Sequence, residues 1–346
     1  MLEQILANEA ISKTLIEKFL KDSLLQSNTV VSTEAIASNS GLDSKTKEVL
    51  NFIHSFPPVY TLDLDMVRKQ RQNPFEHDLA KDVTNLDITI PCNNRDIVAR
   101  VYRPQNTENE ILPALIYFHG GGFVLGDIKS HDKMLAQLCS QSKIAIISIA
   151  YRLAPETMFP GAVEDAQETT DWIAKNSAEL KIDSTRIAIG GDSAGANLAT
   201  VYCHLNRERR DFKPYFQILI YPSIIGNDTS VSRELFSENL LLTKELLKWF
   251  HQQYISKNQE NDSRFNVMNS TDFSNLPPAY ILTGGFDPLR DEGQLYVRKL
   301  IENGVPVKHS CYTDMFHGFI NYGHLQQSKD AVTECAMILN GVMNLK

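Results

Sequence analysis

A serine between two glycines is the residue of this chain best suited to act as a nucleophile. It is Ser193, in the segment Gly-Asp-Ser-Ala-Gly at 191–195, which follows a β-rich run and precedes apolar residues at helical spacing. A serine on a sharp turn from strand to helix projects its hydroxyl above the sheet, and flanking glycines leave room for that turn. The N–H of Ala194, at the start of the helix, can then point at a developing oxyanion. The segment therefore predicts acyl transfer through Ser193.

A serine nucleophile needs a base, and the base needs an acid that orients it. His317, in Met-Phe-His-Gly-Phe, and Asp287, in Gly-Gly-Phe-Asp-Pro-Leu-Arg-Asp, each follow a β-rich run. Open α/β sheets bind ligands at the carboxyl ends of their strands, and serine, acid, histidine is the chain order expected there. Asp291 is the rival acid. We favour Asp287 because it directly follows the glycine turn, and we expect Asp291 to cap or anchor the next helix.

Three successive glycines follow another β-rich run, in His-Gly-Gly-Gly-Phe at 119–123. Backbone N–H groups of glycines can approach a substrate carbonyl closely. The segment has neither the Gly-x-Gly-x-x-Gly spacing nor the Lys-Ser/Thr ending of a phosphate-binding loop. His119 is a second candidate base, but we expect it to shape the loop by bonding to the backbone.

Eight short β-rich runs, with helical patterns between them, would position these segments. The first two are joined by a turn-rich stretch at 92–96, which predicts a hairpin. The later runs are almost continuously apolar, as expected when helices cover both faces of a sheet. The predicted fold class is α/β, with a mostly parallel eight-stranded sheet flanked by helices. The runs are 86–90, 97–102, 114–118, 144–149, 186–190, 216–221, 279–283 and 307–312.

Two parts of the chain fall outside this pattern. The first part is residues 1–85, which are predicted to form an N-terminal extension and cap segment, with Ser44 capping a helix. The catalytic domain is predicted to span 86–346. An insertion at 222–256 is expected to be loop-like up to residue 238 and helical from 243 to 254. We interpret the apolar stripe of that helix as packing against the core or a lid rather than as a ligand site.

The composition narrows the class of protein. Hydrophobic residues make up 42% and charged residues 22%, which supports a sizeable core. The net charge of −8 disfavours the basic surface of a nucleic-acid-binding protein. The five cysteines form no Cys-x-x-Cys pair, which indicates reduced thiols. No signal peptide and no membrane-spanning apolar run is recognisable, so we expect a cytoplasmic protein with no integral membrane association.

Five segments in this order resemble the hormone-sensitive-lipase family (bacterial family IV) of carboxylesterases, in the α/β-hydrolase superfamily. In chain order they are His-Gly-Gly-Gly-Phe at 119–123, Tyr-Arg-Leu-Ala-Pro-Glu at 151–156, Gly-Asp-Ser-Ala-Gly at 191–195, Asp-Pro-Leu-Arg-Asp-Glu at 287–292 and His-Gly-Phe at 317–319. The resemblance spans roughly residues 45–340. It implies an α/β-hydrolase fold with a helical cap built from the N-terminal segment and the insertion. Residues 1–43 have no role assigned by it, and Ala196 stands where many members have glycine.

The resemblance also implies the roles of individual residues. Ser193, Asp287 and His317 would form the catalytic triad, and the N–H groups of Gly121, Gly122 and Ala194 would form the oxyanion hole. The sequence has no His-Glu-x-x-His motif and no Cys/His cluster, so we expect no metal ion and no cofactor.

We predict a serine carboxylesterase that hydrolyses short- to medium-chain esters through an acyl-enzyme. A small-molecule ester is the expected partner, and a homodimer is one option for the oligomeric state. Because an ordinary imidazole titrates near pH ~6.5, kcat/KM is expected to rise through a single ionisation at about pH 6–7. The alternatives are an amide or peptide hydrolase with the same triad, and a ligand-binding receptor on this scaffold. The receptors of this family lack the catalytic histidine, whereas this chain has His317.

Overall fold

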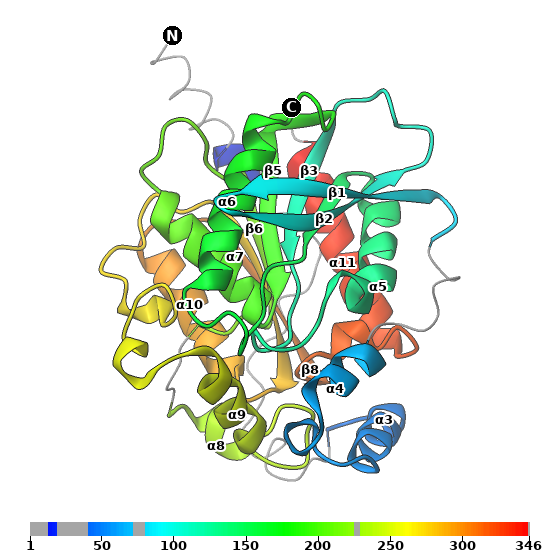
Figure 1. Cartoon of the computed structure of the whole chain (residues 1–346), viewed down its shortest axis with the longest axis vertical. Coiled ribbons are helices and arrows are strands. Elements are labelled where there is room, and N and C mark those ends of the chain that lie inside the picture. Colours follow the sequence, from blue (N-terminus) through cyan, green and yellow to red (C-terminus); the bar gives the residue numbers. More distant parts are fainter. Residues whose placement is uncertain (1–12, 19–40, 72–79, 225–228, 345–346) are drawn as a thin grey trace.

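The computed structural model describes residues 13–18, 41–71, 80–224 and 229–344. Its eight-stranded sheet has the order β1-β2-β4-β3-β5-β6-β7-β8 (Figure 1). β2 is antiparallel to both neighbours, and the other paired strands are parallel. All eight predicted strands are present, several of them longer than predicted. They are β1 Val83–Cys92, β2 Arg95–Pro104, β3 Leu112–Phe118, β4 Ala145–Ile149, β5 Ile182–Asp192, β6 Phe216–Ile220, β7 Ala279–Phe286 and β8 Val307–Phe316.

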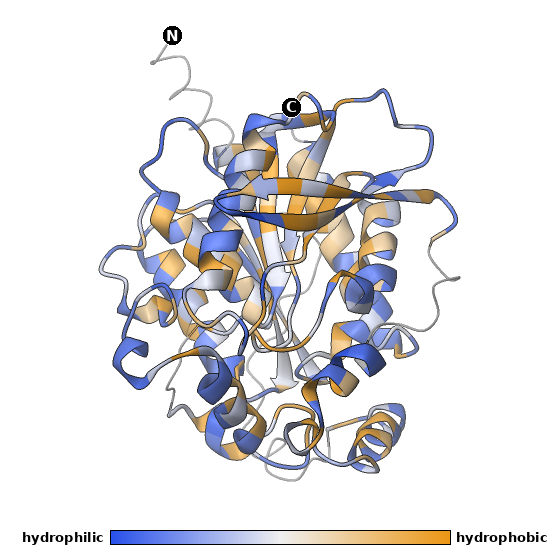
Figure 2. Ribbon diagram, in the orientation of Figure 1, coloured by the Kyte–Doolittle hydropathy of each residue, from blue (hydrophilic) through white to orange (hydrophobic). Residues whose placement is uncertain are grey.

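Helices cover both faces of the sheet. Successive strand residues point to opposite faces, and in the central strands the residues on both faces are apolar and need to be buried. In β3, Ile116 and Phe118 pack in one core with helices α6, α7 and α10, whereas Leu115 and Tyr117 pack in a second core with α5 and α11. Figure 2 shows the apolar strands in the middle and hydrophilic residues on the outer helix surfaces. The helices are α5 Ile128–Ser142, α6 Gly161–Lys175, α7 Ala194–Asn206, α10 Arg290–Glu302 and α11 Gln326–Met343.

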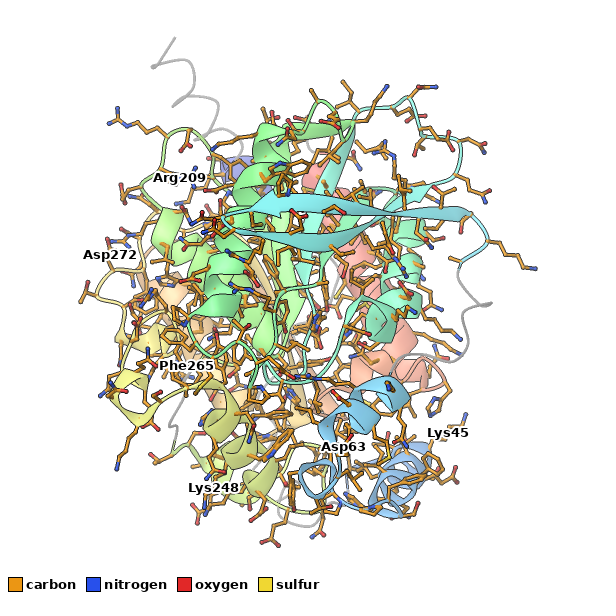
Figure 3. The ribbon with its side chains drawn as sticks, viewed as in Figure 1. Lys45, Asp63, Arg209, Lys248, Phe265 and Asp272 are labelled. Carbon is orange, nitrogen blue, oxygen red and sulfur yellow. The ribbon has the colours of Figure 1, made fainter. Side chains whose placement is uncertain are left out.

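Two segments distant in sequence lie together at one end of the molecule (Figure 1). Figure 3 labels Asp63 in the first of them and Lys248 in the second. Part of the insertion, 225–228, lies outside the described residues. The first segment comprises α3 Ser44–His54, η1 Val59–Thr61 and α4 Leu64–Arg71, and the second comprises α8 Val231–Leu235 and α9 Lys244–Tyr254. We call these two segments together the cap.

Two expectations about the cap are wrong in detail. The N-cap of α3 is Asp43 rather than Ser44, because the Asp43 carboxylate accepts the N–H of Thr46 at 2.7 Å. The stretch 222–238 is also not entirely loop, since it contains α8. The carboxylate of Asp291 accepts the N–H of Ser232 in the first turn of α8 at 2.8 Å, so a residue far along the chain stabilises this short helix.

A short helical piece at 13–18 lies at the end of the molecule opposite to α3 and α4 (Figure 1). Its Ile16 is 1% exposed and packs in the core that contains α5 and α11. This part of the N-terminal extension therefore contributes to the core rather than to the cap. The boundary between residues 85 and 86 stays a prediction.

Candidate active site

Ser193 occupies the turn between β5 and α7, with φ 54° and ψ −118°. A positive φ is strained for a residue other than glycine, and such strain is typical of nucleophiles on this kind of turn. The turn is held by the Ser193 N–H, which donates to the Ile220 carbonyl at 2.9 Å. A Cβ at Gly195 would lie 1.9 Å from the Phe118 carbonyl oxygen, and one at Gly191 would lie 2.4 Å from the same atom. Close packing of the helix against β3 therefore requires both glycines of the motif.

The three residues predicted as a triad lie within hydrogen-bond distance of one another. Ser193 Oγ is 2.9 Å from His317 Nε2, and His317 Nδ1 is 2.8 Å from Asp287 Oδ2. Asp287 is fully buried after β7, and its other oxygen accepts the Leu289 N–H at 2.7 Å. His317 follows β8 and is 6% exposed. Residues 124 positions apart in the chain thus meet at the carboxyl ends of the strands.

Asp291, the rival acid, faces another part of the molecule. One of its carboxylate oxygens accepts the Ser232 N–H, and the other pairs with Arg290 at 2.9 Å. Asp291 thus anchors a helix, but the helix is α8 and not the expected α10, whose N-cap residue makes no side-chain capping hydrogen bond. His317 Nδ1 lies instead within hydrogen-bond distance of Asp287, whose carboxylate accepts.

The glycine loop turns back beside the serine. Gly121 and Gly122 have φ 125° and 62°, and the Gly121 carbonyl accepts the Leu125 N–H at 2.8 Å. Within the described residues, neither glycine donates its own N–H to a protein acceptor. Ala194 is the first residue of α7, so its N–H has no carbonyl one turn before it. All three residues line the same cavity as Ser193.

His119 contacts the backbone, as expected. Its Nδ1 is 2.9 Å from the Gly120 carbonyl oxygen, and its ring stacks on Tyr151 with centroids 4.3 Å apart. Burial, together with the neighbouring His131, lowers the pKa of His119 to about 4, so the imidazole is neutral at physiological pH. The expectation that His119 bonds to the loop backbone is confirmed.

A cavity of about 900 Å³ opens above Ser193. Apolar side chains from both cap segments line it, among them Tyr60 and Leu62 from the first and Leu246 and Phe250 from the second. Its described lining contains no lysine, arginine or glutamate. Its one aspartate, Asp192, and the neighbouring His131 are only 3% and 5% exposed. The cavity therefore favours uncharged, apolar groups.

Two residues near the site were not recognised from the sequence. Tyr221 follows β6 with φ 35°, and its ring centroid lies 4.7 Å from that of His317. Arg68 of α4 donates to the Val124 carbonyl at 2.9 Å and the Ala154 carbonyl at 2.7 Å. It also forms a bidentate ion pair with Glu156 at 2.8 and 3.0 Å. The motif that contains Glu156 was a signal in the sequence, whereas nothing in the sequence singled out Arg68.

The described residues contain no cluster of three or more His, Cys, Asp or Glu side chains that could hold a metal ion. In the same part of the chain, no helix is both long enough and apolar enough to cross a membrane.

Comparison with known proteins identifies the family. The sequence profile of the α/β-hydrolase fold matches residues 115–321. The chain is 39% identical over 247 residues to the carboxylic ester hydrolase LipN of Mycobacterium tuberculosis, a match covering 69% of this chain but only 65% of LipN. It is 31% identical over 281 residues to an ethyl acetate hydrolase of Pseudomonas putida, covering 79% of this chain and 88% of that one.

A solved structure agrees with these sequence matches. The hyperthermophilic esterase of Pyrobaculum calidifontis superposes with a TM-score of 0.81 at 37% identity, covering 86% of this chain and 98% of that one. The chain belongs to the α/β-hydrolase family, in its hormone-sensitive-lipase-like branch. It is a carboxylic-ester hydrolase of the serine type.

Proposed function

We propose that Ser193 is the nucleophile of this esterase, with His317 as its base and Asp287 as the orienting acid. The observation that carries the proposal is the unbroken chain of hydrogen bonds Ser193–His317–Asp287, whose first two members line the cavity. His317 Nε2 takes the hydroxyl proton as Ser193 Oγ attacks the ester carbonyl. Asp287 holds Nδ1–H, so the imidazole presents the correct tautomer and its cation is stabilised.

The oxyanion formed by this attack needs donors on the other side of the carbonyl. We assign that role to the N–H groups of Gly121, Gly122 and Ala194. The tetrahedral intermediate collapses, His317 gives its proton to the leaving alkoxide, and the alcohol departs. Water then attacks the acyl-enzyme with His317 again as base, which releases the carboxylic acid and restores Ser193. The chemistry calls for no cofactor.

The substrate we propose is a short- to medium-chain ester whose acyl and alcohol groups carry no charge. The apolar lining of the cavity supports this choice, as does the similarity to an ethyl acetate hydrolase. Phe250 also lies close to the loop, since a Cβ at Gly122 would come 2.3 Å from its ring. We propose that this ring limits the acyl chain beside the oxyanion donors.

A series of p-nitrophenyl esters from acetate to palmitate tests the chain-length proposal. We expect kcat/KM to rise from acetate towards octanoate and not to rise further for palmitate, because apolar chain beyond the cavity gains no further burial. p-Nitroacetanilide, the amide counterpart of the acetate, serves as a control and should turn over far more slowly. Highest activity on palmitate would contradict the chain-length proposal, and equal activity on the anilide would favour the amidase alternative.

We propose that the enzyme acts in the cytoplasm. Its five cysteines are unpaired, and four of them are buried. Buried free thiols fit a reducing compartment, where disulfides are rare.

Arg68 should couple the cap to the loop that carries the oxyanion donors. Arg68→Met removes four hydrogen bonds, two of them to backbone carbonyls, so we expect the melting temperature to fall by about 3–6 °C. The kcat/KM for the acetate ester should fall a few-fold. Lys69→Met removes the same charge from an exposed position on α4 and is the matched control. Equal effects of the two substitutions would mean that the contacts of Arg68 do not hold the cap.

A further inference from the structure

His131, a residue with no part in the mechanism above, is buried beside the nucleophile turn, next to Asp192. It lies in the first turns of α5 and is 5% exposed. Its Nε2 is 3.1 Å from Asp192 Oδ1 and 3.5 Å from the Asn321 side-chain nitrogen, which belongs to the segment after His317. Its Nδ1 is 2.9 Å from Ser130 Oγ. Both ring nitrogens are therefore engaged.

The partner of His131 connects the two halves of the proposed site. Asp192 directly precedes Ser193, and its Oδ1 also accepts the Gly120 N–H at 2.8 Å and the Tyr117 hydroxyl at 2.8 Å. Gly120 in turn directly precedes Gly121. One buried carboxylate oxygen thus ties the turn that carries the nucleophile to the loop that carries the oxyanion donors. A small shift of either would misalign groups whose geometry must hold to a fraction of an ångström.

Hydrogen-bond geometry allows His131 two protonation states. Ser130 Oγ accepts the Asp127 N–H at 2.9 Å and lies 2.8 Å from the Asp127 carbonyl oxygen. If the hydroxyl proton goes to that carbonyl, His131 Nδ1 must donate to Oγ, and the ring is an imidazolium paired with Asp192. If the hydroxyl proton goes to Nδ1, the ring is neutral and Asp192 is a buried charge held only by neutral donors. Rotation of one hydroxyl separates the two states.

The surrounding charges favour the imidazolium. Burial by itself lowers the pKa of His131, but the carboxylates of Asp192 and Asp127 outweigh it and hold that pKa above its ordinary value. Burial would raise the pKa of Asp192, yet His131, Tyr117 and the Gly120 N–H bring it down to about 2.

The other groups facing this pair carry no charge near neutral pH. The His119 ring lies 5.7 Å away and is neutral, while burial raises the pKa values of Tyr117 and Tyr221. From η4 (Phe319–Asn321) the neighbour is the uncharged Asn321. The next residue on α5, Asp132, points instead to β2, where it bonds Arg100 and Tyr102.

We propose that protonated His131 is a positioning residue, which holds the oxyanion loop against the nucleophile turn and lets activity fall when it loses its Nδ1 proton. This inference rests on the proposed roles of Ser193 and the oxyanion donors. The triad alone predicts that kcat/KM rises with pH and then stays level. Loss of the His131 proton adds a fall in kcat/KM on the alkaline side. Since the pKa of His131 is raised by folding, its stabilising contribution is complete at low pH and is lost as the pH rises through that pKa.

The pH dependence of kcat/KM for p-nitrophenyl acetate between about pH 5 and pH 10 tests the proposal. We expect the wild type to lose on the order of tenfold on the alkaline side of its optimum. In His131→Gln, the amide can still donate to Asp192 but carries no charge and cannot titrate. The variant should therefore be on the order of tenfold less active than the wild type near the optimum and should show no alkaline limb. His324→Gln, which removes an exposed imidazole, is the matched control and should keep the limb.

A second readout separates positioning from simple structural support. Thermal melting of wild type and His131→Gln should differ most at acidic pH, with the difference shrinking as the pH rises. An alkaline limb that persists in His131→Gln, or a wild type without one, would overturn the inference. Failure of the proposed function would appear differently, as activity that survives replacement of Ser193.

Discussion

Replacement of Ser193 by alanine should reduce kcat for p-nitrophenyl esters by about 10⁵- to 10⁶-fold. The substitution removes the attacking oxygen. The residual rate would come from direct attack of water on the bound ester, with the oxyanion donors still stabilising the intermediate. The fold should survive, because the hydroxyl makes one hydrogen bond, to His317, and the strained φ of 54° is set by the backbone. Ester turnover and circular dichroism together measure both parts of this expectation.

Ser223 offers a matched control for that experiment. It lines the same cavity, but His317 bonds to the hydroxyl of Ser193. Ser223→Ala should keep kcat within about threefold of the wild type. A fluorophosphonate probe should modify Ser193 in the wild type and in the Ser223 variant. Labelling of any other serine, or wild-type turnover by Ser193→Ala, would refute the assignment of the nucleophile.

Asp287→Asn should cost about 10⁴-fold in kcat, the loss typical of this substitution in serine hydrolases with a triad. The Leu289 N–H donates to Asp287 Oδ1, so an asparagine would place its carbonyl oxygen there and turn its NH₂ group toward His317 Nδ1. Nδ1 would then become the acceptor, and the proton would sit on Nε2. An Nε2 that already carries a proton cannot take one from Ser193.

Asp291→Asn is the matched control for the acid, because the same change is made four residues away. Its carboxylate supports α8 through Ser232, so we expect a loss of stability with kcat within about threefold of the wild type. Measurement of kcat and melting temperature for both variants separates the two roles. A larger kcat loss in Asp291→Asn than in Asp287→Asn would transfer the acid role to Asp291.

The pH profile connects these variants to His131. Ionisation of the base should give an ascending limb whether or not His131 titrates. Asp287→Asn should lower the whole profile by a constant factor, because it acts on the tautomer of the base. His131→Gln should lower activity below the optimum and remove the alkaline limb, because it fixes this position in an uncharged state. The shape of the profile therefore distinguishes the triad from the residue that positions its surroundings.

Short-range patterns in the sequence were sufficient to predict much of the fold and of the candidate site of this enzyme. Alternation and continuity of apolar residues predicted all eight strands, because side-chain direction in a strand depends only on position along it. The two glycine segments were equally readable, since a positive φ or a carbonyl within van der Waals distance excludes other side chains at those positions. Ser193 and His317 could be named because each follows a predicted strand.

Choices between nearby or similar residues were decided by tertiary structure. Asp287 and Asp291 are four residues apart, and only the packing of α8 against α10 turned Asp291 away from His317. His131 carries no signal in the sequence that distinguishes it from the other histidines, and its environment comes from Asp192 and Asn321, which are distant in the chain. Local sequence determines where a chain turns and which face of an element is apolar. The partner of a buried charge depends on which elements meet, and that is determined by the packing of the whole sheet and its helices.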